Sequence, residues 1–122
     1  MSYPLGVHYH VPHGMAGAVF LPYVVEQNLA RGVTDYAELY TATAGADQLL
    51  GRDARARAFA ARLREVWDEL GIPTTLARFG VGDDIDPLVR DTLDLGAALD
   101  QNPVPFGEAE LRQILGTMTG VA

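Results

Sequence analysis

The clearest structural pattern in the chain is the stretch DARARAFAARLREVWDEL, residues 53–70. Its large apolar side chains recur at helical spacing, at Phe59, Leu63, Val66, Trp67 and Leu70. This spacing puts them on one face of an α-helix, while arginines and acids occupy the other faces. Gly71 then ends the helix. The stretch therefore predicts a helix over residues 53–70 whose Trp67 face belongs to the core.

Helical patterns continue upstream of this stretch. Gly14 to Leu29 is apolar nearly all round, which is typical of a buried helix. Pro22 inside it either kinks the helix or marks the first turn of a second one. Asp35 and Glu38 form a capping-box pattern, which opens a helix of about ten residues.

Three further helices are predicted downstream. Residues 74–79 read as a short helix that Gly80 ends. Asp84 is the expected cap of the next one. Gly107 and Glu110 stand at the N-cap and N3 positions of the last helix.

No segment alternates with period 2, so the fold class is all-α, with about six helices in one domain. Pro4, Gly6 and Pro12 punctuate the start of the chain. We therefore expect residues 1–13 to form an irregular loop that contains all three histidines, and residues 14–122 to form a helical bundle.

Composition excludes several classes of function. The 122 residues are 48% hydrophobic and 20% charged, as in an ordinary globular protein, and they include no Cys. Thiolate chemistry, disulfides and Cys-type zinc sites are therefore excluded. The net charge is −7 and every basic residue is Arg. Clustered positive charge is absent, so we expect neither nucleic acid nor an anionic membrane surface as a partner.

Targeting signals are also missing from the pattern. The stretch from Met1 to Pro4 shows no basic region followed by an apolar one. The longest apolar stretch, Met15 to Val25, is about half the ~20 residues that a membrane-spanning helix needs. These features predict a cytoplasmic protein.

The start of the chain holds the one cluster that could bind a metal. His8, His10 and His13 read H-x-H-x-x-H. Three imidazoles close together can hold a divalent metal, although the spacing matches no standard zinc motif. The alternative is that a Pro-punctuated loop carries its histidines by chance.

Other candidate motifs favour structural roles. The cluster Asp83, Asp84 and Asp86 lacks the Gly and distal Glu of a calcium loop and fits helix capping better. No phosphate-binding glycine motif occurs, and Ser2 is the chain's one serine, which excludes a serine nucleophile.

The residues from Pro4 to Val24 resemble the iron-containing alcohol dehydrogenase family. The family pattern there is H-x-x-x-H-x-L-G-x-x-[FY]-x-x-P-H-G-x-A-N-A-x-x-L-P-x-V. The elements that match in register are Leu5-Gly6, Pro12-His13-Gly14, Ala16 and Ala18, and Leu21-Pro22. The later Leu70-Gly71-Ile72-Pro73 and Asn102-Pro103 junctions also resemble the family, so the resemblance covers essentially the whole chain.

The resemblance implies a role for His13. In the family, the His of Pro-His-Gly is a ligand of a catalytic divalent metal, iron or zinc, which polarises an alcohol or carbonyl oxygen while hydride passes to or from NAD(P). By the same resemblance His10 is a possible neighbour that lines the site, and His8 is a polar surface residue. No catalytic or cofactor-binding residue is assigned to this chain.

The chain departs from the family at several points. The second His of H-x-x-x-H falls on Tyr3, whose phenol oxygen is a weak substitute, and the Asn of Ala-Asn-Ala is Gly17. The glycine-rich nucleotide-binding lobe and most metal ligands of the family have no counterpart in these residues. One protein ligand would not hold a catalytic metal.

Three functions remain open at this point. The chain is the helical lobe of such an oxidoreductase, inactive unless a partner supplies the NAD(P) lobe. Alternatively, it is a non-catalytic oligomerisation module, or a small metal-binding protein that uses His8, His10 and His13. We expect a homo-oligomer or a nucleotide-binding partner chain, joined through an exposed apolar patch over residues 15–25.

Overall fold

The computed structural model describes residues 1–120 as seven α-helices and one 3₁₀ turn, and this part of the chain contains no strand. The elements in order are α1 (Ser2–Tyr9), α2 (His13–Ala30), α3 (Tyr36–Thr41), α4 (Arg52–Glu69), η1 (Ala77–Phe79), α5 (Asp86–Leu93), α6 (Gly96–Leu99) and α7 (Glu108–Thr119). The predicted all-α class is confirmed. No helix within residues 1–120 combines the length and apolarity that a membrane crossing requires.

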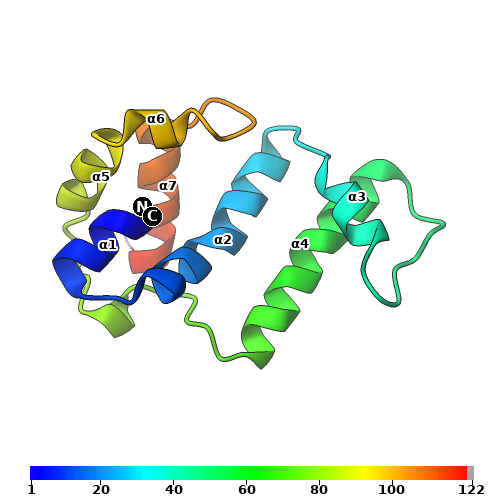
Figure 1. Ribbon diagram of the computed structural model, residues 1–122, viewed down its shortest axis with the longest axis horizontal. Coiled ribbons are helices and arrows are strands. Elements are labelled where there is room, and N and C mark those ends of the chain that lie inside the picture. Colours follow the sequence, from blue (N-terminus) through cyan, green and yellow to red (C-terminus); the bar gives the residue numbers. More distant parts are fainter. Residues whose placement is uncertain (121–122) are drawn as a thin grey trace.

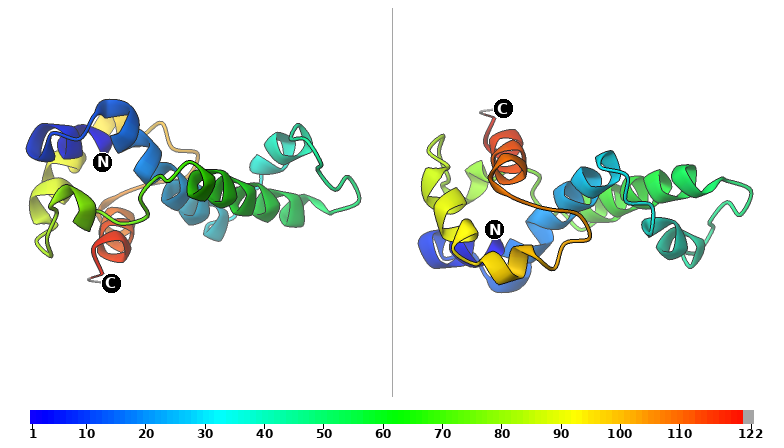
Figure 2. Two further views of the ribbon diagram at one scale, coloured as in Figure 1. Left: turned by 90° about the horizontal axis from the view of Figure 1, so that it is seen from below. Right: turned by 90° about the horizontal axis from the view of Figure 1, so that it is seen from above.

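The helices form two groups that α2 joins (Figure 1). At one end α1 and α7 pack against α2, and α5 and α6 pack beside them. At the other end α3 packs against α4, and the pair extends away from the rest of the chain (Figure 2). Since α2 contacts α1, α7 and α4, it is the central element of the fold.

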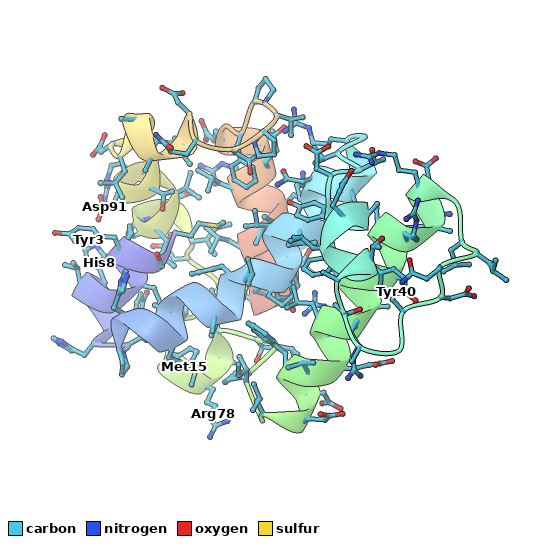
Figure 3. All side chains as sticks on the ribbon, turned by 45° about the vertical axis from the view of Figure 1, so that its right-hand side comes forward. Tyr3, His8, Met15, Tyr40, Arg78 and Asp91 are labelled. Carbon is cyan, nitrogen blue, oxygen red and sulfur yellow. The ribbon has the colours of Figure 1, made fainter. Side chains whose placement is uncertain are left out.

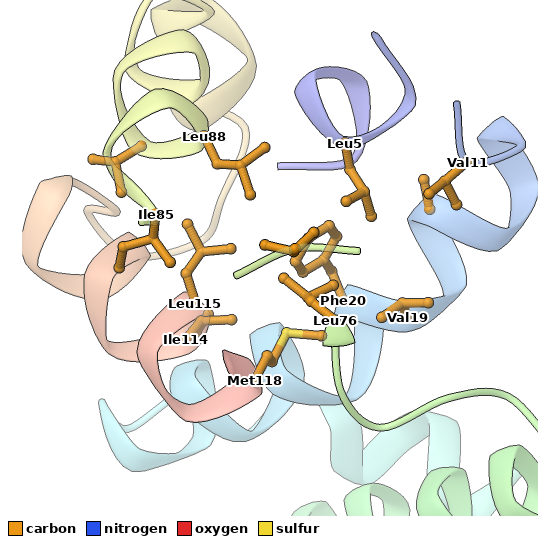
Figure 4. Packing of buried hydrophobic residues seen from close by; sticks show 13 residues of the cluster. Leu5, Val11, Val19, Phe20, Leu76, Ile85, Leu88, Ile114, Leu115 and Met118 are labelled. Atoms are coloured by element: carbon orange, nitrogen blue, oxygen red, sulfur yellow. The ribbon is translucent and has the colours of Figure 1, made fainter. Parts of the chain in front are cut away.

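The hydrophobic core lies in the first group (Figure 4). Its buried members come from α1, α2, α5, α7 and the segment around η1: Leu5, Val11, Ala16, Val19, Phe20, Leu76, Val81, Ile85, Leu88, Val89, Ile114, Leu115 and Met118. Burying one such large aliphatic side chain contributes roughly 1.5–3 kcal/mol. The core therefore holds the two ends of the sequence together around α2.

The predicted irregular loop over residues 1–13 is wrong, because Ser2–Tyr9 is the helix α1. Pro4 lies in its first turn, where the missing N–H has no helical partner to lose. Leu5 is fully buried in the core. Burial of this face stabilises a helix that the Pro and Gly punctuation argues against.

Helix α2 is continuous from His13 to Ala30 with Pro22 inside it, so Pro22 does not begin a second helix. The predicted exposed patch over residues 15–25 is confirmed only in part, since Met15 and Leu21 are exposed. Val19, Phe20, Pro22 and Val25 are buried, because α2 is surrounded by other helices.

The α3–α4 pair differs from prediction in two ways. Helix α3 has six residues, and the Asp35 side chain makes no capping bond. Its carboxylate instead pairs with Arg52 of α4 at 3.1 Å, and Glu38 pairs with the same guanidinium. Helix α4 spans Arg52–Glu69, close to prediction. Its apolar stripe is half-buried against α2 and α3 and lies outside the main core, and Leu70 is exposed.

The C-terminal part agrees with prediction better. The segment 74–79 contains only the 3₁₀ turn η1, which Gly80 ends with a φ of 84°. Helix α5 starts at Asp86 with Ile85 as its N-cap residue, so the expected cap at Asp84 is one residue too early. The Asp84 side chain still accepts a hydrogen bond from the Asp86 N–H at 3.2 Å. The short helix α6 was not expected. Helix α7 begins after Gly107, whose N–H donates to Glu110 at 2.8 Å, as predicted.

Candidate functional site

His8 lies in the last turn of α1 and is tied to α5. Its Nε2 hydrogen-bonds to the carboxylate of Asp91, which lies 83 residues away in the sequence. This hydrogen bond lowers the pKa of Asp91. Figure 3 shows the two side chains together at the outer edge of the molecule, with Tyr3 beside them. His8 is a surface residue as predicted, and it joins two helices.

A tight turn connects α1 to α2. His10 ends α1 with φ 55° and ψ 31°, the left-handed conformation that non-glycine residues seldom adopt. A Cβ added at Gly6 would lie 3.3 Å from the Val11 carbonyl oxygen, so the chain passes close to α1 here. Val11 is buried in the core. The turn therefore has a defined shape and delivers the next residues to the start of α2.

His13 is the first residue of α2. Pro12 precedes it as the N-cap residue and accepts a hydrogen bond from the Ala16 N–H at 2.9 Å. The His13 side chain is exposed, and within residues 1–120 its ring makes no hydrogen bond. Both ring nitrogens are thus accessible from outside, on a backbone held by the core.

The three histidines do not form one site. Among residues 1–120 no three His, Cys, Asp or Glu side chains are close enough to hold a metal ion together. His8 is paired with Asp91, His10 lies in the left-handed turn after α1, and His13 begins α2. The residues described therefore do not fit a complete metal site, and the role of His13 as a metal ligand stays a prediction.

Tyr3 stands where the family has an imidazole, and its phenol oxygen is predicted to be a weak substitute. Its side chain is 63% exposed on α1, on the same outer side as His8 (Figure 3). A role for its phenol oxygen remains a prediction.

A second polar contact joins α2 to the loop after α6, and the sequence analysis did not predict it. Asn28 is buried in α2, and its Nδ2 donates to Oδ1 of Asn102 at 2.9 Å. The Asn102 Nδ2 donates back to the Asn28 Oδ1 at 2.8 Å and to the Val104 carbonyl at 2.9 Å. Asn28 also donates to the hydroxyl of Tyr36 at 3.1 Å. The available signal was the polar run Glu26-Gln27-Asn28 near the end of a largely apolar helix, which neither singles out Asn28 nor identifies its partner.

Comparison with known proteins decides the family. The family profile described as Fe-containing alcohol dehydrogenase family, C-terminal, matches residues 1–119. The chain belongs to the iron-containing alcohol dehydrogenase family. The resemblance of the Pro12-His13-Gly14 region is thereby confirmed at the level of the family, and the all-helical fold agrees with it.

Three curated proteins show the range of relatives. Long-chain-alcohol dehydrogenase 1 of Geobacillus thermodenitrificans is 30% identical over 115 residues. The NADPH-dependent butanol dehydrogenase of Clostridium saccharobutylicum is 25% identical over 119 residues, and the 1,3-propanediol dehydrogenase of Klebsiella pneumoniae is 32% identical over 117 residues. Each alignment covers 93% of this chain but only 29% or 30% of the relative. No solved structure matches the chain significantly.

Proposed function

We propose that this chain is the helical metal-site lobe of an NAD(P)-dependent oxidoreductase that acts on alcohols. The family match over residues 1–119 supports the reaction class, and the three relatives are named as dehydrogenases of alcohols. In this reaction a hydride leaves the carbinol carbon for the nicotinamide ring, the hydroxyl proton is released and a carbonyl compound forms. The chain covers less than a third of each relative, so the proposed activity is that of a larger assembly.

The placement of His13 carries the proposal. The side chain is exposed at the first residue of α2, the helix that runs through the core, while the turn before it is anchored by buried Val11. A ligand on a rigid element reaches a metal with little loss of conformational freedom. His13 is thus suited to complete a site whose other ligands come from outside these residues. His10 lines that site as a neighbour, and Tyr3 is a weaker candidate.

The remaining requirements concern partners. The nucleotide must be bound by a nucleotide-binding lobe, either continuous with this chain or in a companion chain. The alternative partner is a second copy of this chain in a homo-oligomer. The metal is iron or zinc. We expect the assembly to work in the cytoplasm.

The test is a chimera in which the preceding part of the Geobacillus relative is joined to Met1. Metal content by elemental analysis and alcohol-dependent reduction of NAD(P)⁺ are measured together. We expect both in the chimera, and loss of both in His13→Ala. His8→Gln is the matched control, since it removes an imidazole from the same region but can still hydrogen-bond to Asp91. Metal bound equally well without His13 would overturn the proposal.

A further inference from the structure

A pocket of about 360 Å³ opens on α2 away from His13. Leu21, Val24 and Val25 of α2 form one wall. The other wall comes from α6 and the loop after it, and consists of Ala98, Leu99, Gln101, Asn102, Pro103 and Phe106. Leu21 lies eight residues beyond His13, which is about 12 Å along a helix axis. The pocket is therefore separate from the His13 turn.

The lining of this pocket lacks charged side chains, as the centre of a protein interface often does. None of its residues is Asp, Glu, Lys or Arg, although 20% of the chain is charged. Charged side chains are depleted at the centre of protein interfaces. Leu21 is 43% exposed there, a large apolar side chain left in contact with water.

Four polar side chains line the pocket, those of Asn28, Tyr36, Gln101 and Asn102. The Tyr36 hydroxyl accepts a hydrogen bond from Asn28 at 3.1 Å, and within residues 1–120 its own proton has no acceptor. The two asparagines beneath it are satisfied by each other. An occupant can therefore bury apolar side chains here while it accepts one hydrogen bond from Tyr36.

The comparisons indicate which occupant. The matching profile is the C-terminal part of the family, and the relatives contain about three times as much sequence as the matched region. In the relatives, the remaining polypeptide therefore precedes this region. Met1 lines the pocket, so that polypeptide reaches the region at the edge of the pocket. We infer that the pocket receives an apolar segment from the part of the enzyme that directly precedes the matched region. This inference rests on the proposed function.

The experiment compares the chain alone with the chimera that carries the preceding part of the Geobacillus enzyme. Hydrogen exchange of the backbone amides of residues 98–102 is measured in both. We expect exchange in the chimera to be at least tenfold slower. Leu21→Asp places a charge in the pocket and should abolish this protection. Leu49→Asp is the matched control, because Leu49 is 95% exposed and does not line the pocket.

Several outcomes would overturn the inference. Equal exchange in the chain and the chimera means that the segment does not dock here. If Leu21→Asp and Leu49→Asp change the exchange protection equally, the segment does not bind in the pocket. Dimers of the chain alone that Leu21→Asp disrupts assign the pocket to a second copy. His13→Ala separates the two proposals, since it should remove metal from the chimera and leave the protection intact.

Discussion

Trp67 of α4 donates its indole N–H to the carbonyl oxygen of Ala18 in α2, at 2.6 Å. Ala18 lies four residues before Pro22, which has no N–H to complete the helical hydrogen bond to that carbonyl. The indole therefore supplies the donor that the proline removes. This contact explains how α2 stays continuous through Pro22 and where α4 docks on it.

The first prediction is that Trp67 and Pro22 are coupled. Trp67→Phe leaves the Ala18 carbonyl without a donor and should lower the free energy of unfolding by about 1–3 kcal/mol. In a Pro22→Ala background the new N–H can bond Ala18, so the same substitution should have a smaller effect. Urea denaturation of the four proteins gives the coupling, which we expect to exceed about 0.5 kcal/mol. Equal effects in both backgrounds would show that the indole N–H does not replace the missing donor.

The second prediction concerns the amide pair Asn28 and Asn102. Asn28→Ala removes a buried amide and takes from the partly buried Asn102 both of its hydrogen bonds to Asn28, which costs about 1–3 kcal/mol of unfolding free energy. Gln27 and Gln113 form a matched control, because their amides bond at 3.1 Å at an exposed position. Gln27→Ala should change stability by less than about 0.5 kcal/mol. Chemical denaturation measures both, and a larger loss for the exposed pair would contradict the burial argument.

The third prediction tests helix α1. Leu5 is fully buried, whereas Val7 on the same helix is 53% exposed. Leu5→Ala should lower the unfolding free energy by about 2–5 kcal/mol. Val7→Ala should change it by no more than about 0.5 kcal/mol. If residues 1–13 were an irregular loop outside the core, thermal unfolding of the two variants would be alike.

The fourth prediction concerns pH and the start of α7. The pKa of Glu110 is lowered, first by the Gly107 N–H and then by its own backbone N–H, with a contribution from Arg31. A lowered pKa in the folded chain means that the carboxylate stabilises the fold above its unfolded pKa of about 4.3, and that this stability is lost as the pH falls through the lower folded value. Glu110→Gln should therefore flatten the decline of the melting temperature below about pH 4.3.

The control for this prediction is Glu108→Gln. It makes the same change in net charge on the same helical turn, and it leaves the hydrogen bond between Gly107 and Glu110 in place. Melting temperatures of the three proteins are recorded from neutral to acid pH. A flattening of equal size in both variants would show that net charge, and not the capping bond, sets the slope.

Local signals account for the elements that were predicted well. The apolar residues from Phe59 to Trp67 recur at helical spacing over more than two turns, which predicts a helix. Helix α4 ends within one residue of the expected position, and Gly71 follows with a φ of 70°. Gly107 and Glu110 begin α7 as expected, because a capping box is an interaction within one turn. The Pro12-His13-Gly14 motif also led to the family, which the match over residues 1–119 confirms.

Other features depended on residues far away in the sequence. Pro4 and Gly6 argued against α1, but the burial of Leu5 against the core outweighs them. The Asp35 carboxylate does not make the predicted capping bond and instead accepts a hydrogen bond from Arg52, 17 residues away. In each case a contact with another helix competes with a local preference of about 1 kcal/mol and wins.

The sequence by itself determined the helical class, the extent of α4, the start of α7 and the family, because these depend on periodicity, caps and motifs that neighbouring residues carry. Only the tertiary structure decided that α1 is a helix, that His8 pairs with Asp91 and Asn28 with Asn102, and that the histidines within residues 1–120 belong to no three-ligand cluster. These partners are 74 to 83 residues apart. Bringing such distant residues together costs conformational entropy. Burial of apolar side chains in the shared core around α2 offsets that cost, and no local pattern specifies this core.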